Sequence, residues 1–422
     1  MVASEDKAML DSNTFPTPNK DQLRLITSAV IYGANASGKS NLLRAMQTLK
    51  RLVVDSASKM QVGTKLPVES FRLNSKSKNQ PTNFEIIFIH QDIRYEYGVI
   101  LNRERVYEEW LIAYPNERPQ SWFSRKYLAE SLELKGNQQY KWSFGKALKG
   151  EKQSIKKLVR SNSLFLSHAA QNNHEQLTQI FEWFQSYLNI LTPNSIFEGF
   201  TLRVCDEDDT FRQQVVNLLS EADIGISNLK IERKSISDTE ISLAKKIFIK
   251  KLFENQGIEE DIDIEKLQSL EIKTLHKMND SEQEVEFEME EESDGTQRLF
   301  ELAGLWLYVL QHGETLVVDE LGRSLHPVLT KALIKMFNNP EINQNNAQII
   351  FTIHDTTLLD TQIFRQDQIW FTEKEKSATH LYSLLEFMTR EDESLQKGYL
   401  LGRYGAVPFI NGLNKINYAE KR

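Results

Sequence analysis

The chain has 422 residues and carries 59 Asp and Glu against 51 Lys and Arg, a formal net charge of −8 that gives no overall attraction for nucleic acid. This length predicts two to three folding units with ample apolar residues for a core, while no apolar run approaches the roughly 18–20 residues of a membrane span and no signal peptide is visible, so no membrane partner is expected. The single Cys205 excludes an internal disulfide and a Cys-x-x-Cys zinc hook, which favours a reducing cytoplasm.

The first motif along the chain is a phosphate-binding loop. Residues 33–40 read Gly-Ala-Asn-Ala-Ser-Gly-Lys-Ser, directly after a charge-free apolar run and directly before a segment with apolar residues at helical spacing. Gly33 and Gly38 let the backbone curl so that successive N–H groups face one anion at a helix N-terminus. Lys39 is expected to reach the β- and γ-phosphates of a nucleotide, and the Ser40 hydroxyl to ligate Mg²⁺.

After this motif, the sequence predicts a group of strands followed by a helical region. Residues 82–90, 94–101 and 106–114 alternate aromatic and β-branched residues, which predicts an antiparallel β-meander. A turn is expected at residues 115–119, where two prolines occur. Residues 174–191 carry apolar residues at helical spacing and predict one helix that faces the core.

A highly charged stretch follows between residues 230 and 279. It contains a predicted helix near residues 238–255 and the acidic segment 259–263, which we interpret as a short helical hairpin inserted in a helical lobe. A solvated insertion without a partner is the alternative. Residues 282–292 alternate apolar residues with acids and predict a strand with one solvated face.

An apolar strand followed by two carboxylates lies far downstream, at residues 315–320. Asp319 is expected to hold Mg²⁺ through water, and Glu320 to polarise the attacking water. An acidic pair at a strand end is a weak signal alone, but beside a phosphate-binding loop it becomes specific. A second apolar strand, residues 348–354, ends at His354, which is expected to touch the γ-phosphate; a plain loop histidine is the alternative.

A further loop precedes the acidic strand. Residues 292–297, Glu-Ser-Asp-Gly-Thr-Gln, come just before a long apolar helix at about 297–311. Ser293 and the Gly295 amide would lie at a helix N-terminus, where they would bind the γ-phosphate held by a second protomer. The order of phosphate loop, signature loop, acidic strand and histidine matches ABC-type ATPases. It differs from AAA+ machines, which lack a signature loop and use arginine fingers.

Three domains are expected from this order. Residues 1–150 would hold the P-loop half of the ATPase core with the antiparallel β-subdomain, residues 151–285 the helical lobe with its charged insertion, and residues 286–422 the signature, acidic-strand and histidine half. The predicted fold class is α/β: an ABC-type P-loop NTPase core with a mixed sheet flanked by helices, an antiparallel β-meander and an inserted helical lobe.

These motifs resemble the ABC-type ATPases of prokaryotic defence, which are related to the OLD and RecF/SMC-like proteins. The most similar are the RloA and AbiL-type abortive-infection ATPases, with the AriA component of PARIS systems nearby. The resemblance is carried by residues 29–41, residues 292–299, the Asp-Glu pair with Ser-Leu-His-Pro at 324–327, and the tail Gly-Tyr-Leu-Leu-Gly-Arg-Tyr-Gly-Ala-Val-Pro at 398–408.

The resemblance implies further residue roles and the cofactors ATP and Mg²⁺. Asn35, Ser37 and Asn41 would join the phosphate loop, Gln171 would be the Q-loop glutamine that senses Mg²⁺, and residues 324–326 would form the D-loop toward the opposite protomer. A Leu-His pair at 325–326, where transporters usually have Leu-Asp, argues against a transporter subunit. Members usually open with a strand containing an Asn-Phe-Arg-like turn, so the first strand of the nucleotide sheet is expected to be absent here.

The expected function is a dimerising ATPase, a homodimer or higher homo-oligomer formed through an ATP sandwich, that acts as the sensor or scaffold of a defence pair. The region around Asp392 lacks the Glu and Asp-x-Asp pattern of the nuclease domain found in OLD proteins, so a separate, nuclease-like effector is expected. Two alternatives stay open: a RecF/SMC-like repair ATPase that binds DNA, and an interaction protein that binds ATP, barely hydrolyses it and sequesters a toxic effector.

Overall fold

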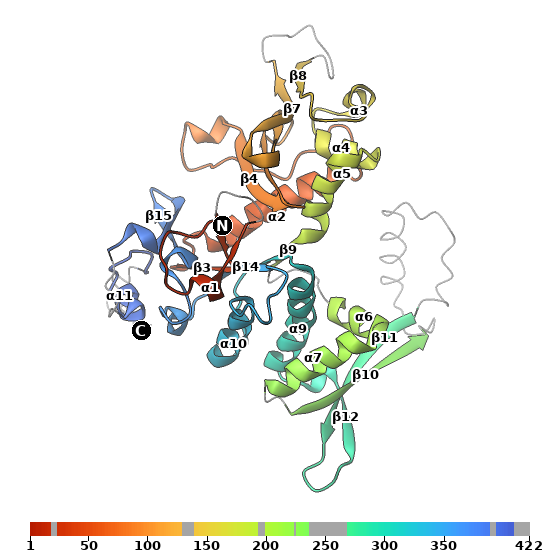
Figure 1. Cartoon of the computed structure of the whole chain (residues 1–422), viewed down its shortest axis with the longest axis vertical. Helices are drawn as coiled ribbons and strands as arrows, with labels where there is room; N and C mark the ends of the chain where they lie inside the picture. Colours follow the sequence, from red (N-terminus) through yellow and green to blue (C-terminus); the bar gives the residue numbers. More distant parts are fainter. Residues whose placement is uncertain are drawn as a thin grey trace, which may run out of the picture. The chain divides into compact units, whose positions relative to one another are not determined.

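The computed structural model describes residues 1–17, 23–128, 139–192, 199–222, 225–235, 268–388 and 394–408 (Figure 1). The chain divides into two compact units. The first comprises Met1–Ser195, Val309–Arg323 and Thr330–Arg422, and the second comprises Ile196–Tyr308 and Ser324–Leu329. The helix predicted near residues 238–255 and the acidic segment 259–263 lie outside the described residues.

The first unit is built on a six-stranded sheet in which the P-loop strand is central. The strand order is β16-β15-β3-β14-β13-β9, with parallel pairing throughout except for the antiparallel β15–β16 pair. The strands are β3 (Ser28–Gly33), β9 (Leu188–Leu191), β13 (Thr315–Val318), β14 (Gln348–Thr352), β15 (Ile369–Glu375) and β16 (Ala378–Ser383). Every residue of β3 is buried, as expected for a parallel strand covered on both faces. This sheet confirms the α/β class.

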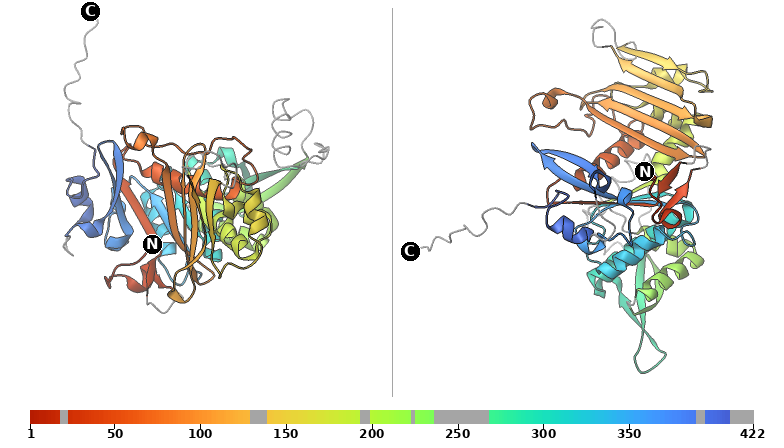
Figure 2. Two further views of the ribbon diagram at one scale, coloured as in Figure 1. Left: turned by 90° about the horizontal axis from the view of Figure 1, so that it is seen from above. Right: turned by 60° about the vertical axis from the view of Figure 1, so that its left-hand side comes forward.

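A second sheet in the same unit is the predicted meander. Its strands pair in chain order and are antiparallel: β4 (Thr82–His90), β5 (Ile93–Leu101), β6 (Val106–Tyr114), β7 (Gln120–Tyr127) and β8 (Tyr140–Phe144). Figure 2 shows these strands side by side, coloured orange to yellow. The prediction of three antiparallel strands is confirmed, and two further strands extend the sheet.

One hydrophobic core joins the two sheets of this unit through helices. The helices are α2 (Lys39–Asp55), α3 (Gln153–Leu158), α4 (Phe165–Gln171) and α5 (Glu175–Glu182). Leu43 and Leu52 of α2 belong to the same buried cluster as Ile31 of β3 and as Phe88 and Tyr97 of the meander. The phosphate loop is therefore anchored at the start of a helix whose apolar face is buried between two sheets.

The single helix predicted over residues 174–191 is wrong at its carboxyl end. The α-helix α5 ends at Glu182, a π-helical turn η4 (Trp183–Tyr187) follows, and Leu188–Leu191 form β9. These four residues pair in parallel with Thr315–Val318 of β13, and Leu188, Ile190 and Leu191 are buried. Pairing with β13 outweighs the helical spacing, because a short apolar run fits a buried strand equally well.

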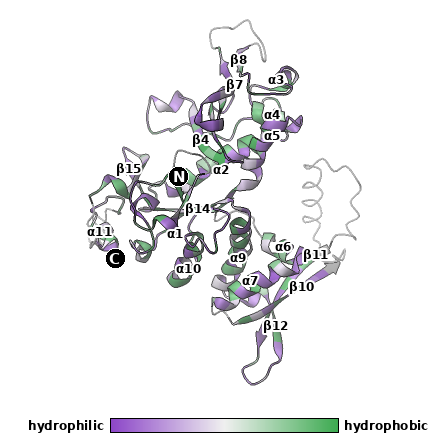
Figure 3. Ribbon diagram, in the orientation of Figure 1, coloured by the Kyte–Doolittle hydropathy of each residue, from purple (hydrophilic) through white to green (hydrophobic). Residues whose placement is uncertain are grey.

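The second unit combines helices with a small sheet. It contains α6 (Phe200–Glu207), α7 (Asp209–Glu221) and most of α9 (Asp294–His312), together with the antiparallel strands β10 (Ile226–Ser235), β11 (Gln268–Lys277) and β12 (Glu284–Glu288). β12 confirms a strand within the predicted range 282–292, but Met289–Glu291 form a 3₁₀ turn, and Val285 and Phe287, expected on the unsolvated face, are exposed. Hydrophobic residues gather along α9 (Figure 3), where Leu299, Leu302, Trp306 and others are buried. The lobe that was expected to be helical thus also holds a three-stranded sheet.

Shorter elements complete the described chain. They are α1 (Leu10–Asn13), β1 (Thr14–Pro16), β2 (Arg24–Ile26), α10 (Pro327–Phe337), α11 (Leu395–Leu400) and the 3₁₀ turns η1 (Ser77–Asn79), η2 (Pro115–Glu117), η6 (Met289–Glu291), η7 (Thr356–Leu358), η8 (Gln366–Gln368) and η9 (Leu384–Glu386). Within the described ranges, every helix is either too short or too polar to cross a bilayer.

Candidate nucleotide site

Parallel pairing brings the carboxyl ends of three strands to one edge of the central sheet. β3 pairs with β14, and β14 pairs with β13, all in the same direction. The phosphate loop follows β3, Asp319 and Glu320 follow β13, and His354 follows β14 by two residues. Ligands of α/β proteins bind at this kind of edge, outside the carboxyl ends of parallel strands.

The phosphate loop is a tight turn that ends on Lys39, the first residue of α2. Ala36 and Gly38 have φ angles of 63° and 110°, in the left-handed region, and the glycine meets that requirement without steric cost. The Lys39 side chain is almost fully buried, and its ammonium donates to the carbonyls of Gly33 (2.6 Å) and Ala34 (3.1 Å). Burial lowers the pKa of Lys39, although the negative charges of Asp319 and Glu320 oppose the shift.

The remaining loop residues occupy the positions that the motif implies. Ser37 is buried inside the turn, whereas Asn35 is exposed on its outer side. Ser40 and Asn41 lie in the first turn of α2, and the Asn41 N–H donates to the carbonyl of Gly38, the N-cap residue (3.0 Å). The loop thus leads directly into the N-terminus of a helix, a position that suits phosphate oxygens.

Two threonines that the sequence did not single out support the loop from the β15–β16 hairpin. The hydroxyls of Ser37 and Thr372 form a hydrogen bond (2.6 Å), and Thr379 Oγ1 donates to the Ser37 carbonyl (2.8 Å). A side chain on Gly33 would collide with Thr372, and one on Gly38 would collide with Thr379. The two glycines are therefore required by close packing as well as by backbone geometry.

Thr352 at the end of β14 fixes the two carboxylate residues, and it too was missed in the sequence. Its hydroxyl donates to Asp319 Oδ1 (2.6 Å) and accepts from the Glu320 backbone N–H (2.8 Å). Asp319 is buried, and its own N–H donates to the carbonyl of Leu191 at the end of β9 (2.9 Å). Glu320 has φ 56°, an uncommon left-handed conformation for a residue with a side chain. Such backbone strain often accompanies a functional position.

His354 lies beside Glu320. Its Nε2 is 3.9 Å from Glu320 Oε1, and both side chains are about half exposed. Burial and the positive charge of Lys39 lower the pKa of His354, and the charges of Glu320 and Asp319 only partly oppose this. The ring is therefore neutral at pH 7, so one ring nitrogen can donate a hydrogen bond and the other can accept one.

Ser293 and Gly295 belong to the second unit, at the N-terminus of α9. Ser293 Oγ accepts from the Thr296 N–H (3.2 Å), and the Gln297 N–H donates to the Ser293 carbonyl (2.9 Å). A Cβ on Gly295 would lie only 2.9 Å from the carbonyl oxygen of Ser324. The loop that resembles an ABC signature thus packs against the segment that resembles a D-loop.

Gln171 does not lie at this site. It is the exposed last residue of α4, and Ser167 of the same helix donates to the Val53 carbonyl near the carboxyl end of α2. Val53 is 14 residues beyond Lys39 in that helix, a distance of roughly 21 Å at about 1.5 Å per residue. The apolar segment before Gln171 forms the core helix α4, in which Phe165–Ala169 are buried.

The residues near the sheet edge suit Mg²⁺ together with a phosphate ligand. In the described part of the chain, no group of three or more His, Cys, Asp and Glu side chains could hold a metal. Ser40 and Asp319 provide a hydroxyl and a carboxylate, which are hard oxygen ligands, and Thr352 occupies only one of the two Asp319 oxygens. Mg²⁺ commonly takes one or two protein oxygens and completes its shell with water and phosphate.

The fold and the site define a P-loop ATPase. Residues 28–360, well over half of the chain, match the family described as "AAA domain, putative AbiEii toxin, Type IV TA system", and the chain belongs to this family. No curated protein sequence matches the chain significantly.

Three of the solved structures with some similarity to the chain are heads of SMC proteins. An SMC head bound to the C-terminal winged-helix domain of ScpA has 12% identity and a TM-score of 0.40, covering 87% of this chain and 95% of that one. The SMC head domain of Thermotoga maritima has 11% identity and a TM-score of 0.37, covering 88% and 96%. A Pyrococcus furiosus SMC head with an extended coiled coil, bound to the C-terminal domain of ScpA, has 13% identity and a TM-score of 0.32, covering 90% and 94%. No activity or partner follows from similarity at this level.

Proposed function

We propose that this protein is a Mg²⁺-dependent ABC-type ATPase of the RloA/AbiL-like kind, related to AriA of PARIS, that serves as the sensor or scaffold subunit of an anti-phage abortive-infection system. The effector would be a separate, nuclease-like protein. The observation that carries the ATPase assignment is the placement of Lys39, Asp319 and Glu320 at one sheet edge. The defence role draws on the sequence resemblance and on the toxin–antitoxin context in the family's description.

The residues at the sheet edge have separate tasks in ATP hydrolysis. Lys39 would exchange the carbonyls of Gly33 and Ala34 for the β- and γ-phosphates, so its buried charge would be paired with phosphate. Mg²⁺, held by Ser40 and Asp319, would neutralise charge on the phosphates. Glu320 would orient a water for in-line attack, and neutral His354 would donate a hydrogen bond toward the γ-phosphate.

The second half of the site would come from another copy of the chain. Ser293 and the Gly295 amide lie at the N-terminus of α9, a position suited to an anion. In a homodimer or higher homo-oligomer these groups would contact the γ-phosphate bound by the opposite protomer. Bound ATP would then contact both protomers and stabilise the dimer, and ATP hydrolysis would allow the dimer to dissociate.

A phage-challenge experiment tests the proposed role. Cells that express the chain together with its neighbouring genes are expected to limit phage spread, and Lys39→Ala is expected to abolish protection because the phosphates lose their buried cation. Lys7→Ala, a change at an exposed lysine far from any motif, serves as the matched control. Equal protection by Lys39→Ala and the unaltered protein would contradict a nucleotide-dependent role.

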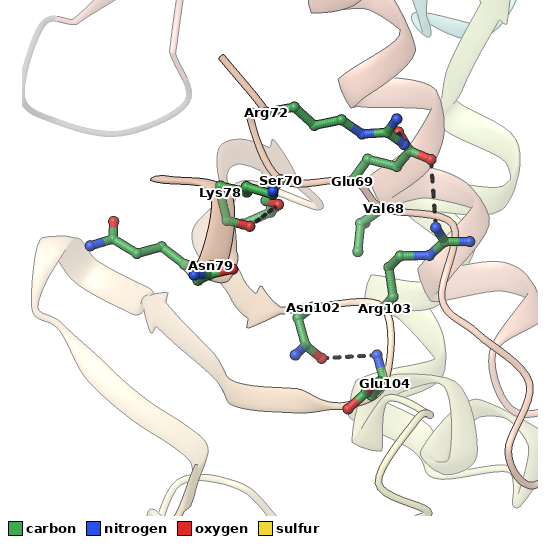
Figure 4. A pocket seen from close by; sticks show the side chains of 11 residues that line it. Val68, Glu69, Ser70, Arg72, Lys78, Asn79, Asn102, Arg103 and Glu104 are labelled. Carbon is green, nitrogen blue, oxygen red and sulfur yellow. Dashed lines mark hydrogen bonds and ion pairs between the residues drawn. The ribbon is translucent and has the colours of Figure 1, made fainter. Parts of the chain in front are cut away.

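A RecF/SMC-like DNA-binding ATPase is the second candidate, favoured by one local feature. A cavity of about 310 Å³ is lined by Arg72, Lys78 and Arg103 among polar residues (Figure 4). Glu69 already pairs with Arg72 (2.5 Å) and lies 3.7 Å from Arg103, so much of this positive charge is compensated. DNA-stimulated turnover with a steep salt dependence, weakened by Lys78→Ala, would favour this candidate over the first.

A further inference from the structure

Glu292, the residue before Ser293, is held by four hydrogen-bonded contacts inside the second unit. Only 11% of its side chain is exposed. Its Oε1 accepts from Thr274 Oγ1 (2.5 Å) and lies 2.7 Å from His276 Nε2. Its backbone carbonyl accepts from Gln297 Nε2 (2.9 Å), and its N–H donates to the Met289 carbonyl (3.2 Å). The residue that precedes the signature loop is therefore held through its backbone and through its Oε1.

The two side chains that hold this carboxylate come from the small sheet. Thr274 and His276 are two residues apart in β11, so they point to the same face of the strand. Thr274 is fully buried, and the His276 ring packs edge-on against Phe287 of β12, with centroids 5.0 Å apart. Because both donors are immobilised by the sheet, they determine where the Glu292 carboxylate lies.

The loop after Glu292 has little freedom of its own. Ser293 is bonded to Thr296 through its hydroxyl and to the Gln297 N–H through its carbonyl, and Gly295 lies against Ser324. A buried carboxylate that loses a donor must regain one from water or from another group. A shift of Glu292 toward water would move the attached Ser293 with it.

We propose that His276 is a positioning residue for the ATP-bridged contact, acting through Glu292 to place Ser293 and the Gly295 amide against the γ-phosphate of the opposite protomer. The proposal rests on the dimeric ATPase described above. His276 itself touches no nucleotide. The role requires a proton on Nε2, because a carboxylate can only accept a hydrogen bond.

The experiment compares His276→Leu with His276→Gln, each in the Glu320→Gln background. Gln can present its side-chain N–H near the position of Nε2, whereas Leu cannot donate. With ATP and Mg²⁺, His276→Leu is expected to raise the dimer dissociation constant by about tenfold or more, as for the loss of a hydrogen bond to a charged group. ATP affinity measured at concentrations where the protein is monomeric is expected to be unchanged, since the P-loop lies in the other unit. His276→Gln is expected to restore most of the dimerisation.

Lys277→Ala is the matched control, because Lys277 is the next residue of β11 and its ion pair with Glu282 is exposed. It is expected to dimerise like the background protein. Dimerisation of His276→Leu equal to that control would overturn the positioning role, and so would a His276→Gln variant as weak as His276→Leu. Failure of the Glu320→Gln protein itself to dimerise would instead reject the proposed function.

Discussion

The meander and the edge of the central sheet, both in the first unit, each bury charged side chains, and the pairing of these charges differs. In the meander, Glu109 is fully buried and accepts from Tyr97 Oη (3.1 Å) and from the backbone N–H groups of Phe165 (2.8 Å) and Leu166 (3.1 Å). Arg125 Nε lies 3.0 Å from its second oxygen. At the sheet edge, by contrast, the buried Lys39 ammonium donates to the neutral carbonyls of Gly33 and Ala34, and Glu320 Oε1 lies 3.9 Å from Nε2 of the neutral His354 ring.

This difference in pairing indicates that the charge of Glu109 is structural, whereas the charges at the sheet edge are functional. The Glu109 carboxylate oxygens accept hydrogen bonds from the meander and from the N-terminus of α4, so they connect the meander to the helices. These oxygens are therefore not available to bind a ligand. The charges of Lys39, Asp319 and Glu320 are incompletely paired with one another. Such an arrangement is stable at a site that a charged ligand completes.

The largest expected effect is at the incompletely paired site. Glu320→Gln removes the carboxylate that orients water, so kcat for ATP hydrolysis is expected to fall by about 10²–10⁴-fold while ATP binding is retained. Phosphate-release kinetics and equilibrium binding of a fluorescent ATP analogue measure the two quantities. Glu341→Gln, at an exposed position, is the control. Unchanged turnover in Glu320→Gln would reject the role of this residue.

Breaking the buried ion pair of Glu109 and Arg125 is expected to affect stability instead. Glu109→Ala leaves Arg125 buried without its counter-ion, and the free energy of unfolding is expected to fall by about 3–5 kcal/mol. The double variant Glu109→Leu/Arg125→Met, which removes both charges, is expected to lose much less. Urea denaturation followed by circular dichroism measures both, and equal losses would contradict the importance of the unpaired charge.

The structural region is also expected to show a pH dependence of stability. Burial, and to a lesser extent the charges of Arg160 and Arg125, lower the pKa of His168 from 6.5 to about 4. Between these values the unfolded chain binds the proton and the folded chain does not, so stability is lost as pH falls from 6.5 toward 4. The full contribution is about 3 kcal/mol.

This contribution can be isolated with His168→Gln. Gln keeps a polar partner for Ser163 Oγ, which lies 2.8 Å from His168 Nε2, but it does not titrate. The difference in unfolding free energy between the two proteins is expected to change over pH 6.5 to about 4, and a difference independent of pH would contradict the shifted pKa.

The smallest expected effect comes from Thr352. Thr352→Val leaves Asp319 and the Glu320 N–H without their shared hydroxyl, which corresponds to about 1–3 kcal/mol and hence about a 5- to 100-fold lower kcat. Thr352→Ser keeps the hydroxyl and is expected to stay close to the unaltered rate. Steady-state turnover distinguishes them, and a fully active Thr352→Val would show that this bond does not position Glu320.

The site residues that could be predicted are those that belong to a motif of consecutive or nearly consecutive residues. The glycines and lysine of the phosphate loop, and the carboxylates after β13, are set by strand, turn and helix signals within a few residues. Thr352, Thr372 and Thr379 could not be predicted, because their contacts depend on the register of strands more than 30 or more than 300 residues away along the chain. A threonine in a strand carries no sign of such a partner.

The secondary structure was predicted correctly where a long segment alternates between apolar and polar residues. It was missed where the same apolar residues fit a helix and a strand equally well. The meander strands were found because period-two alternation continues over nine residues. β9 was missed, since Leu188 and Leu191 also continue the helical spacing of α5, and only the neighbouring β13 decides between the two. The Q-loop role of Gln171 came from the resemblance and from its place after the apolar segment 162–170, which ends in α4 beside the carboxyl end of α2.

Sedimentation velocity of the Glu320→Gln protein with and without ATP and Mg²⁺ tests the central claim most directly. The predicted result is a monomer without nucleotide and a dimer with saturating ATP and Mg²⁺, because hydrolysis is blocked while each Ser293 loop still meets the nucleotide of the other protomer. A strictly monomeric protein under saturating ATP and Mg²⁺ would contradict the account.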